Sequence, residues 1–235
     1  KPAVPEPRIV RGSSLIEKVM LPASAVQPVG DRGEVIERVV ATYHESLSRS
    51  KTALEYLKSR GIGDMEMLRR FRVGYSSGTL KDKASAKSDT GKMLRAFGYV
   101  NERGYEHFTG CVVWPIHDAT GAAVGMYGRR MIGKQGAPKH LYLPGPHRGI
   151  FNRTGAKAAA ASGKPVIMCE CVIDAHSCIV AGISSAIALY GTNGLTGEHI
   201  DLLREIVPQK IVLMLDADKA GSEATVKIAE RLAPL

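Results

Sequence analysis

The spacing of hydrophobic positions divides the chain into a helical part and a part that contains strands. From residue 31 to residue 97, apolar side chains recur every three or four positions, which is typical of amphipathic helices. The clearest apolar stripe consists of Val35, Ile36, Val39, Val40, Tyr43 and Leu47. We expect a helix that begins near Asp31, a surface loop over Ser76–Ser88, and further helices over Thr52–Ser59, Met65–Phe71 and Gly91–Phe97.

Two strand-like segments come next and predict a hairpin. Cys111–His117 and Ala122–Met131 have the composition of strands, and Asp118–Gly121 between them has the composition of a turn. Residues 133–149 are rich in basic residues, glycine and proline, so we expect a loop there. An alanine-rich helix over Gly155–Ala161 ends this part of the chain.

From Lys164 onward, predicted strands and helices alternate. The strands cover Val166–Cys169, Ser185–Leu189 and Ile211–Leu215, and the helices cover Asp174–Ala181, Gly197–Ile206 and Ala220–Leu232. Alternation at these lengths predicts βαβ units and a buried parallel sheet. The predicted fold class is therefore α/β, with a linker or arm over residues 1–30, an α+β subdomain over 31–163 and a parallel-sheet subdomain over 164–235.

Carboxylates follow two of the predicted strands. Glu170 and Asp174 come after the first strand, and Asp216 and Asp218 come after the third. Open α/β sheets place their sites at the carboxyl ends of their strands, so we expect these side chains to lie close together. Neighbouring carboxylates repel each other, and a divalent ion such as Mg²⁺ or Mn²⁺ relieves the repulsion. The alternative is that the aspartates cap the helices that follow them.

Positive charge is concentrated just upstream of these acids. The chain has a formal net charge of +9, and the stretch from Ala119 to Cys169 contains no Asp or Glu. Such a stretch is typical of a protein that binds nucleic acid or polyphosphate, although a solvated basic surface is the alternative. Its cations are Arg129, Arg130, Lys134, Lys139, Arg148, Arg153, Lys157 and Lys164.

Other features restrict the class of protein. No apolar run approaches the roughly 20 residues that span a bilayer, so we expect no membrane partner. The 4 cysteines have no zinc-type spacing and are expected to be buried free thiols of a cytoplasmic protein. His176 and His199 lie on predicted helices, where we expect surface or capping roles.

The acidic segments resemble a known fold. Residues 170–174 (ECVID) and 216–218 (DAD) are similar to the E-G-x-x-D and D-x-D signatures of the TOPRIM fold, which primases, topoisomerases and some nucleases share. Several segments resemble the catalytic cores of DnaG-type bacterial, phage and plasmid primases. They are residues 56–61 (YLKSRG), 71–75 (FRVGY), 113–118 (VWPIHD) with Gly128-Arg129, 138–141 (PKHL) and 216–221 (DADKAG).

The resemblance implies an enzyme that makes short RNA primers on single-stranded DNA. Glu170 and Asp174 would be catalytic, Glu170, Asp216 and Asp218 would hold Mg²⁺ or Mn²⁺, and Arg129, Arg130 and Lys139 would contact nucleotide or nucleic acid. The implied partners are a single-stranded DNA template, ribonucleoside triphosphates, the RNA–DNA hybrid product and a replicative helicase.

The chain departs from the family at two positions. Cys171 stands where the family has a glycine after the glutamate, and Tyr142 stands where it has an asparagine. A side chain at the glycine position can alter the metal pocket, since glycine allows close approach of the backbone. Two alternatives therefore stay open. One is another TOPRIM enzyme, either a nuclease or a topoisomerase, and the other is a single-stranded-DNA-binding module whose acidic site has lost its activity.

Overall fold

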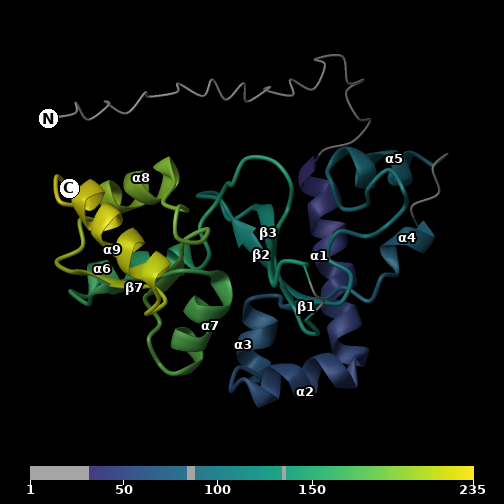
Figure 1. The fold of residues 1–235 in the computed structure, drawn as a ribbon, viewed down its shortest axis with the longest axis horizontal. Coiled ribbons are helices and arrows are strands. Elements are labelled where there is room, and N and C mark those ends of the chain that lie inside the picture. Colours follow the sequence, from purple (N-terminus) through teal and green to yellow (C-terminus); the bar gives the residue numbers. More distant parts are fainter. Residues whose placement is uncertain (1–31, 84–87, 134–135) are drawn as a thin grey trace, which may run out of the picture.

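The computed structural model describes residues 32–83, 88–133 and 136–235, and the expected arm over residues 1–30 lies outside this range. The described chain has a helical end and a parallel-sheet end, which lie on opposite sides of strands β2 and β3 (Figure 1). The mixed α/β fold class is confirmed, because one antiparallel and one parallel sheet are present. In the described residues, every helix is too short or too polar to cross a membrane.

The helical end follows the apolar stripe of the sequence. Helices α1 (Arg32–Arg49), α2 (Lys51–Ser59), α3 (Met65–Arg70) and α5 (Asp89–Ala96) match the expected segments, and a short helix α4 (Leu80–Lys83) lies within the expected loop. The side chains of Ser50 and Asp64 accept hydrogen bonds from Ala53 N and Met67 N, at 3.2 and 2.9 Å, and so fix the first turns of α2 and α3.

The antiparallel sheet has the order β1-β2-β3-β4, with β1 (Gly74–Tyr75), β2 (Cys111–His117), β3 (Ala123–Arg130) and β4 (His140–Tyr142). The β2–β3 hairpin confirms the expected one, and its turn is held by Asp118, whose carboxylate accepts from Thr120 N at 2.8 Å. Strand β4 lies in the expected loop. It pairs with β3 and buries Leu141, and three residues are too few to show a strand period in the sequence.

The parallel sheet has the order β6-β5-β7, with β5 (Val166–Cys169), β6 (Ala186–Ala188) and β7 (Ile211–Met214). Its helices are α6 (Arg153–Ala161), α7 (Val172–Val180), α8 (Gly197–Ile206) and α9 (Lys219–Leu232), and α6 packs on β5, β6 and α8. The expectation of fully buried strands holds for β5 and β6. It is wrong for β7, which lies at an edge of the described sheet and is only half-buried.

The two parts of the molecule share one hydrophobic core. Trp114 and Tyr127 of the antiparallel sheet belong to the same buried cluster as Ile167, Val172 and Ile173 of the parallel-sheet part. Helix α7 lies in this cluster and carries buried side chains on most of its length. The relative position of the two sheets is therefore fixed by packing rather than by a linker.

Two histidines correct the expectation of surface positions, because both are fully buried. His199 does cap α8, since its Nδ1 accepts from Thr196 N at 3.2 Å while Nε2 donates to Ala188 O at 3.0 Å. His176 of α7 packs against Phe71 and Trp114, and neither of its ring nitrogens has a hydrogen-bond partner within the described residues.

Candidate active site

The predicted meeting of carboxylates at the strand ends occurs for Glu170 and Asp216. Glu170 follows β5 and Asp216 lies just after β7. These two strands pair in parallel, and Cys169 at the end of β5 lies opposite Met214 at the end of β7. The backbone N–H of Asp216 donates to Glu170 Oε2 at 3.3 Å. Burial raises the pKa of Glu170, and the Asp216 N–H opposes this effect. The charges of Asp216, Asp174 and Asp218 raise the pKa further.

Asp174 caps a helix and belongs to the same site. It lies in the first turn of α7, where its Oδ2 accepts from the backbone N–H of Cys171 at 3.3 Å and from the Cys171 thiol at 2.8 Å. Burial, followed by the charge of Asp174, raises the pKa of Cys171 to about 12, so the thiol keeps its proton. The side chain at the family's glycine position therefore donates a hydrogen bond to one of the site acids.

Asp218 follows the capping alternative. Its Oδ1 accepts from Gly221 N at 2.8 Å and caps α9, and its side chain is exposed. Gly221 also allows a close approach, because a Cβ at this position would lie 2.0 Å from the carbonyl oxygen of Asp216. Within the described residues, no group of three or more His, Cys, Asp or Glu side chains is already arranged to hold a metal ion.

A pocket of about 530 Å³ brings the acids and two of the predicted cations together. Glu170, Asp174 and Asp216 line it together with Arg129 and Lys139. The described structure adds lining residues that were not expected to be catalytic, metal-binding or nucleic-acid-binding, and Arg60 is the most distant of them from the acids in the sequence. In the sequence, these residues are marked only by their position, because most of them lie in or next to segments that resemble the primase motifs. They are Arg60, His140, Tyr142, Cys171, Ile173, Tyr190, Gly191 and Thr192.

Arg130 is not among the residues that line this pocket. Its Nε donates to Pro138 O and its Nη1 to Thr109 O, each at 3.3 Å. These two bonds tie the guanidinium to neighbouring loops. Arg129 and Arg130 are adjacent on a strand, and their side chains therefore point to opposite faces of the sheet.

A chain of hydrogen bonds links Arg129 to Asp174 across the wall of the pocket. The guanidinium of Arg129 donates to Nε2 of His140, whose Nδ1 lies 2.9 Å from the hydroxyl of Tyr127. That hydroxyl lies 3.5 Å from the sulfur of Cys171, which in turn donates to Asp174. Burial and then the charge of Arg129 lower the pKa of His140, so the ring is neutral and can accept from the arginine.

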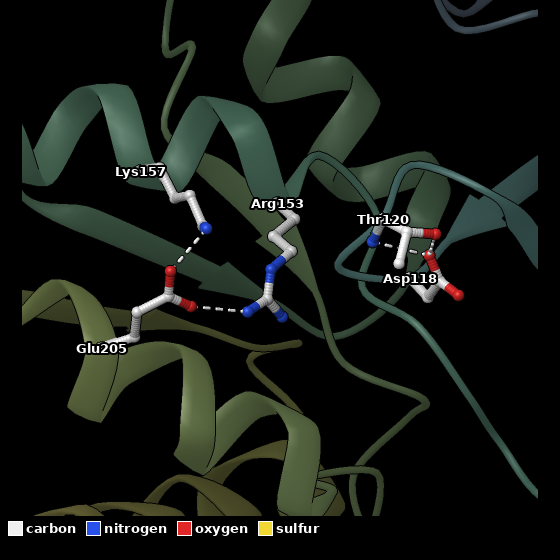
Figure 2. A network of polar contacts seen from close by, with 5 residues as sticks. All are labelled: Asp118, Thr120, Arg153, Lys157 and Glu205. Carbon is white, nitrogen blue, oxygen red and sulfur yellow. Dashed lines mark hydrogen bonds and ion pairs between the residues drawn. The ribbon is translucent and has the colours of Figure 1, made fainter.

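The acid-free stretch does not form one continuous basic surface. Arg153 and Lys157 of α6 form ion pairs with Glu205 of α8, at 2.7 and 2.5 Å (Figure 2). These two cations connect helices, whereas Arg129 and Lys139 line the pocket with the acids. Lys134 lies outside the described residues.

The sequence matches two known families. Residues 42–156 match the family described as DNA primase catalytic core, N-terminal domain, and residues 167–234 match the Toprim-like family. The DNA primase of Deinococcus radiodurans is 35% identical in an alignment 188 positions long, which covers 74% of this chain and 32% of that protein. The DNA primase of Helicobacter pylori is 30% identical in an alignment 216 positions long, which covers 85% of this chain and 36% of that protein. The chain thus spans about a third of the length of these curated relatives.

Solved structures show the same fold. The zinc-binding and RNA polymerase domains of the Aquifex aeolicus primase match with a TM-score of 0.72 and 27% identity, over 85% of this chain and 51% of that one. A DnaG primase catalytic domain bound to single-stranded DNA matches with a TM-score of 0.69 over 84% of this chain and 67% of that one. At 24% identity it supports the fold alone. The chain belongs to the DnaG-type primase family, with the N-terminal region of the catalytic core followed by a Toprim-like region.

Proposed function

We propose that this chain is the catalytic core of a DNA primase, which makes short RNA primers on single-stranded DNA. The observation that carries the proposal is the single pocket in which Glu170, Asp174 and Asp216 lie with Arg129 and Lys139. Nucleotidyl transfer needs both groups, because carboxylates bind divalent ions and cations bind the phosphates of nucleotide and template. The names of the relatives support the same function.

The donor set fits a divalent ion such as Mg²⁺ or Mn²⁺. Divalent ions of this kind bind carboxylate oxygens. The charges of Asp216, Asp174 and Asp218 raise the pKa of Glu170, and a bound divalent ion would neutralise part of this negative charge. Glu170 and Asp216 would hold the ion. Asp218 would use Oδ2, since its Oδ1 caps α9, and Asp174 would support the site from the first turn of α7.

The reaction joins the 3′ oxygen of one nucleotide to the α-phosphorus of the next and releases pyrophosphate. A bound divalent ion would stabilise the negative charge of the phosphates. Arg129 and Lys139 would bind phosphates of the nucleotide or the template, and the hydrogen-bond chain through His140 would orient Arg129. We assign Arg130 to the loops beside the pocket, where it would contact the template backbone.

The partners of the proposed reaction are a single-stranded DNA template, ribonucleoside triphosphates and the RNA–DNA hybrid that forms. Binding of single-stranded DNA is the part that a structural neighbour supports, since that catalytic domain was solved with single-stranded DNA. We also propose a replicative helicase as a partner and the cytoplasm as the location.

The test is primer synthesis by wild-type protein and by a Glu170→Gln variant, with single-stranded template, labelled ribonucleotides and Mg²⁺ or Mn²⁺. We expect Glu170→Gln to abolish synthesis and to leave the affinity for single-stranded DNA nearly unchanged, because the substitution removes charge from the acids and not from the cations. Glu230→Gln, an exposed position on α9, is the matched control. Full synthesis by Glu170→Gln would contradict the site, and DNA binding without any synthesis by the wild type would favour a binding module.

A further inference from the structure

Three aromatic rings from separate segments gather beside the acid pocket. Tyr142 ends β4, Tyr190 follows β6, and His147 lies in the loop between β4 and α6. The ring centroids of Tyr142 and Tyr190 are 5.0 Å apart. The rings of His147 and Tyr190 are stacked, with centroids 4.3 Å apart and an interplanar angle of 7°.

The two tyrosines are held by their hydroxyl groups. The hydroxyl of Tyr190 lies 2.6 Å from Arg148 O and 3.1 Å from Gly149 O, and the hydroxyl of Tyr142 donates to Leu189 O at 3.4 Å. Because the hydroxyls bond to the backbone, their rings are fixed in place. Both side chains remain only half-buried, unlike Tyr127 and Tyr43 of the core.

The tyrosines form part of the pocket wall, whereas the histidine does not. Tyr142 and Tyr190 line the same pocket as Arg129, Lys139 and the three acids. His147 is not among the lining residues of that pocket, so it packs on the tyrosines from outside. The pocket thus has an acidic side, a basic side and an aromatic side, all within about 530 Å³.

We propose that Tyr142 and Tyr190 form a stacking wall for a nucleobase, an inference that rests on the proposed function. Aromatic rings bind bases of any sequence through their π-faces, and cations beside the rings bind the phosphates of the same strand or nucleotide. The resemblance to DnaG-type cores places Tyr142 where their motif has an asparagine. The base belongs either to the template strand or to the bound nucleotide.

The test compares strands with and without bases. Fluorescence anisotropy measures the affinity of the protein for a labelled oligodeoxythymidylate and for an abasic oligonucleotide of the same length. We expect Tyr142→Leu to weaken binding of the base-bearing strand by about fivefold or more and to leave binding of the abasic strand unchanged. Tyr142→Phe, which keeps the ring, should bind both strands much like the wild type. Tyr105→Leu, at an exposed aromatic residue outside the pocket, is the matched control.

Titration of the same variants with ATP identifies the source of the base. If Tyr142→Leu loses affinity only for ATP, the wall binds the base of the nucleotide. If it loses affinity only for oligodeoxythymidylate, the wall binds a base of the template. An equal, measurable loss of affinity for base-bearing and abasic strands, or no loss of affinity for either oligodeoxythymidylate or ATP, would overturn the proposal. The primer-synthesis assay tests the proposed function separately. The affinities for oligodeoxythymidylate, the abasic strand and ATP are measured without catalysis, so the two proposals can fail independently.

Discussion

At the scale of single residues, Cys171 shows how a departure from the family can be accommodated. Its side chain is buried, donates to Asp174 and contacts the hydroxyl of Tyr127. The backbone at this position is extended, with φ −140° and ψ 172°, which any residue adopts. The family's glycine is therefore not needed here for its backbone freedom.

We expect Cys171→Gly to lower the free energy of unfolding by about 1–3 kcal/mol, because it removes a buried side chain and its hydrogen bond. Cys171→Ser keeps a donor to Asp174 and should destabilise the protein less. Urea unfolding of both variants measures the difference. If the glycine variant is as stable as the wild type, the thiol makes no useful contact.

A second prediction at this scale separates cations that bind phosphate from cations that bind Glu205. Lys139→Ala should weaken binding of single-stranded DNA and reduce the slope of log affinity against log salt by about one unit. Lys157→Ala removes the same charge from α6, where it pairs with Glu205, and should leave the slope unchanged. Equal slopes for the two variants would show that the two lysines contribute equally to binding.

At the scale of elements, the sequence predicts best where a periodic pattern is long. The β2–β3 hairpin, α1 and the alternating strands and helices after Lys164 lie where the pattern places them. The short elements α4 and β4 are set by tertiary packing, since a few residues cannot display a period. The burial of β7 was overestimated because the sequence does not reveal which strands the helices cover. Both β6 and β7 lie at an edge of the described sheet, and α6 and α7 pack on β5 and β6.

The start of α9 provides a prediction at this scale. Gly221→Ala would place a Cβ 2.0 Å from the carbonyl oxygen of Asp216, so the helix must move away from the strand end. We expect a loss of about 1–3 kcal/mol in the free energy of unfolding and weaker primer synthesis. Gly197→Ala is the control. Gly197 is the first residue of α8, and a Cβ added there would meet no neighbouring side chain or strand within 4 Å, so we expect the substitution to be tolerated. Equal behaviour of the two variants would show that α9 adjusts freely.

At the scale of the whole molecule, the candidate site was predictable only in part. Glu170 and Asp216 could be brought together from the sequence because each follows a strand, and parallel strands end at one edge of the sheet. Asp218 instead caps α9 and is not among the residues that line the pocket. The position of Arg60 in the same pocket depends on how the helical part packs against the parallel sheet, and no local pattern records that packing. His176 was misplaced for the same reason, since it is buried between α7 and the residues of the other part.

His176 makes the stability of the shared core depend on pH. Burial lowers its pKa to about 4, and the charge of Asp64 opposes this only weakly. The unfolded state therefore binds more protons than the folded state between about pH 6.5 and pH 4, and stability falls as the pH falls through this window. The loss is about 3 kcal/mol when the folded-state pKa is 4.

We expect His176→Leu to flatten this dependence, because leucine binds no proton. Urea unfolding at several pH values from 7 to 4 measures the change, and His199, which is also buried with a lowered pKa, remains in both proteins. Parallel stability curves for the variant and the wild type would show that His176 is not the group responsible.

The two sides of the pocket differ in how easily they can evolve. Glu170 and Asp216 follow strands that are hydrogen-bonded to each other, so their spacing changes only if the sheet itself changes. Lys139, Tyr142 and Tyr190 lie next to loops, where substitutions and insertions are tolerated. A lineage can therefore alter what the pocket selects while the spacing of its acids is inherited unchanged.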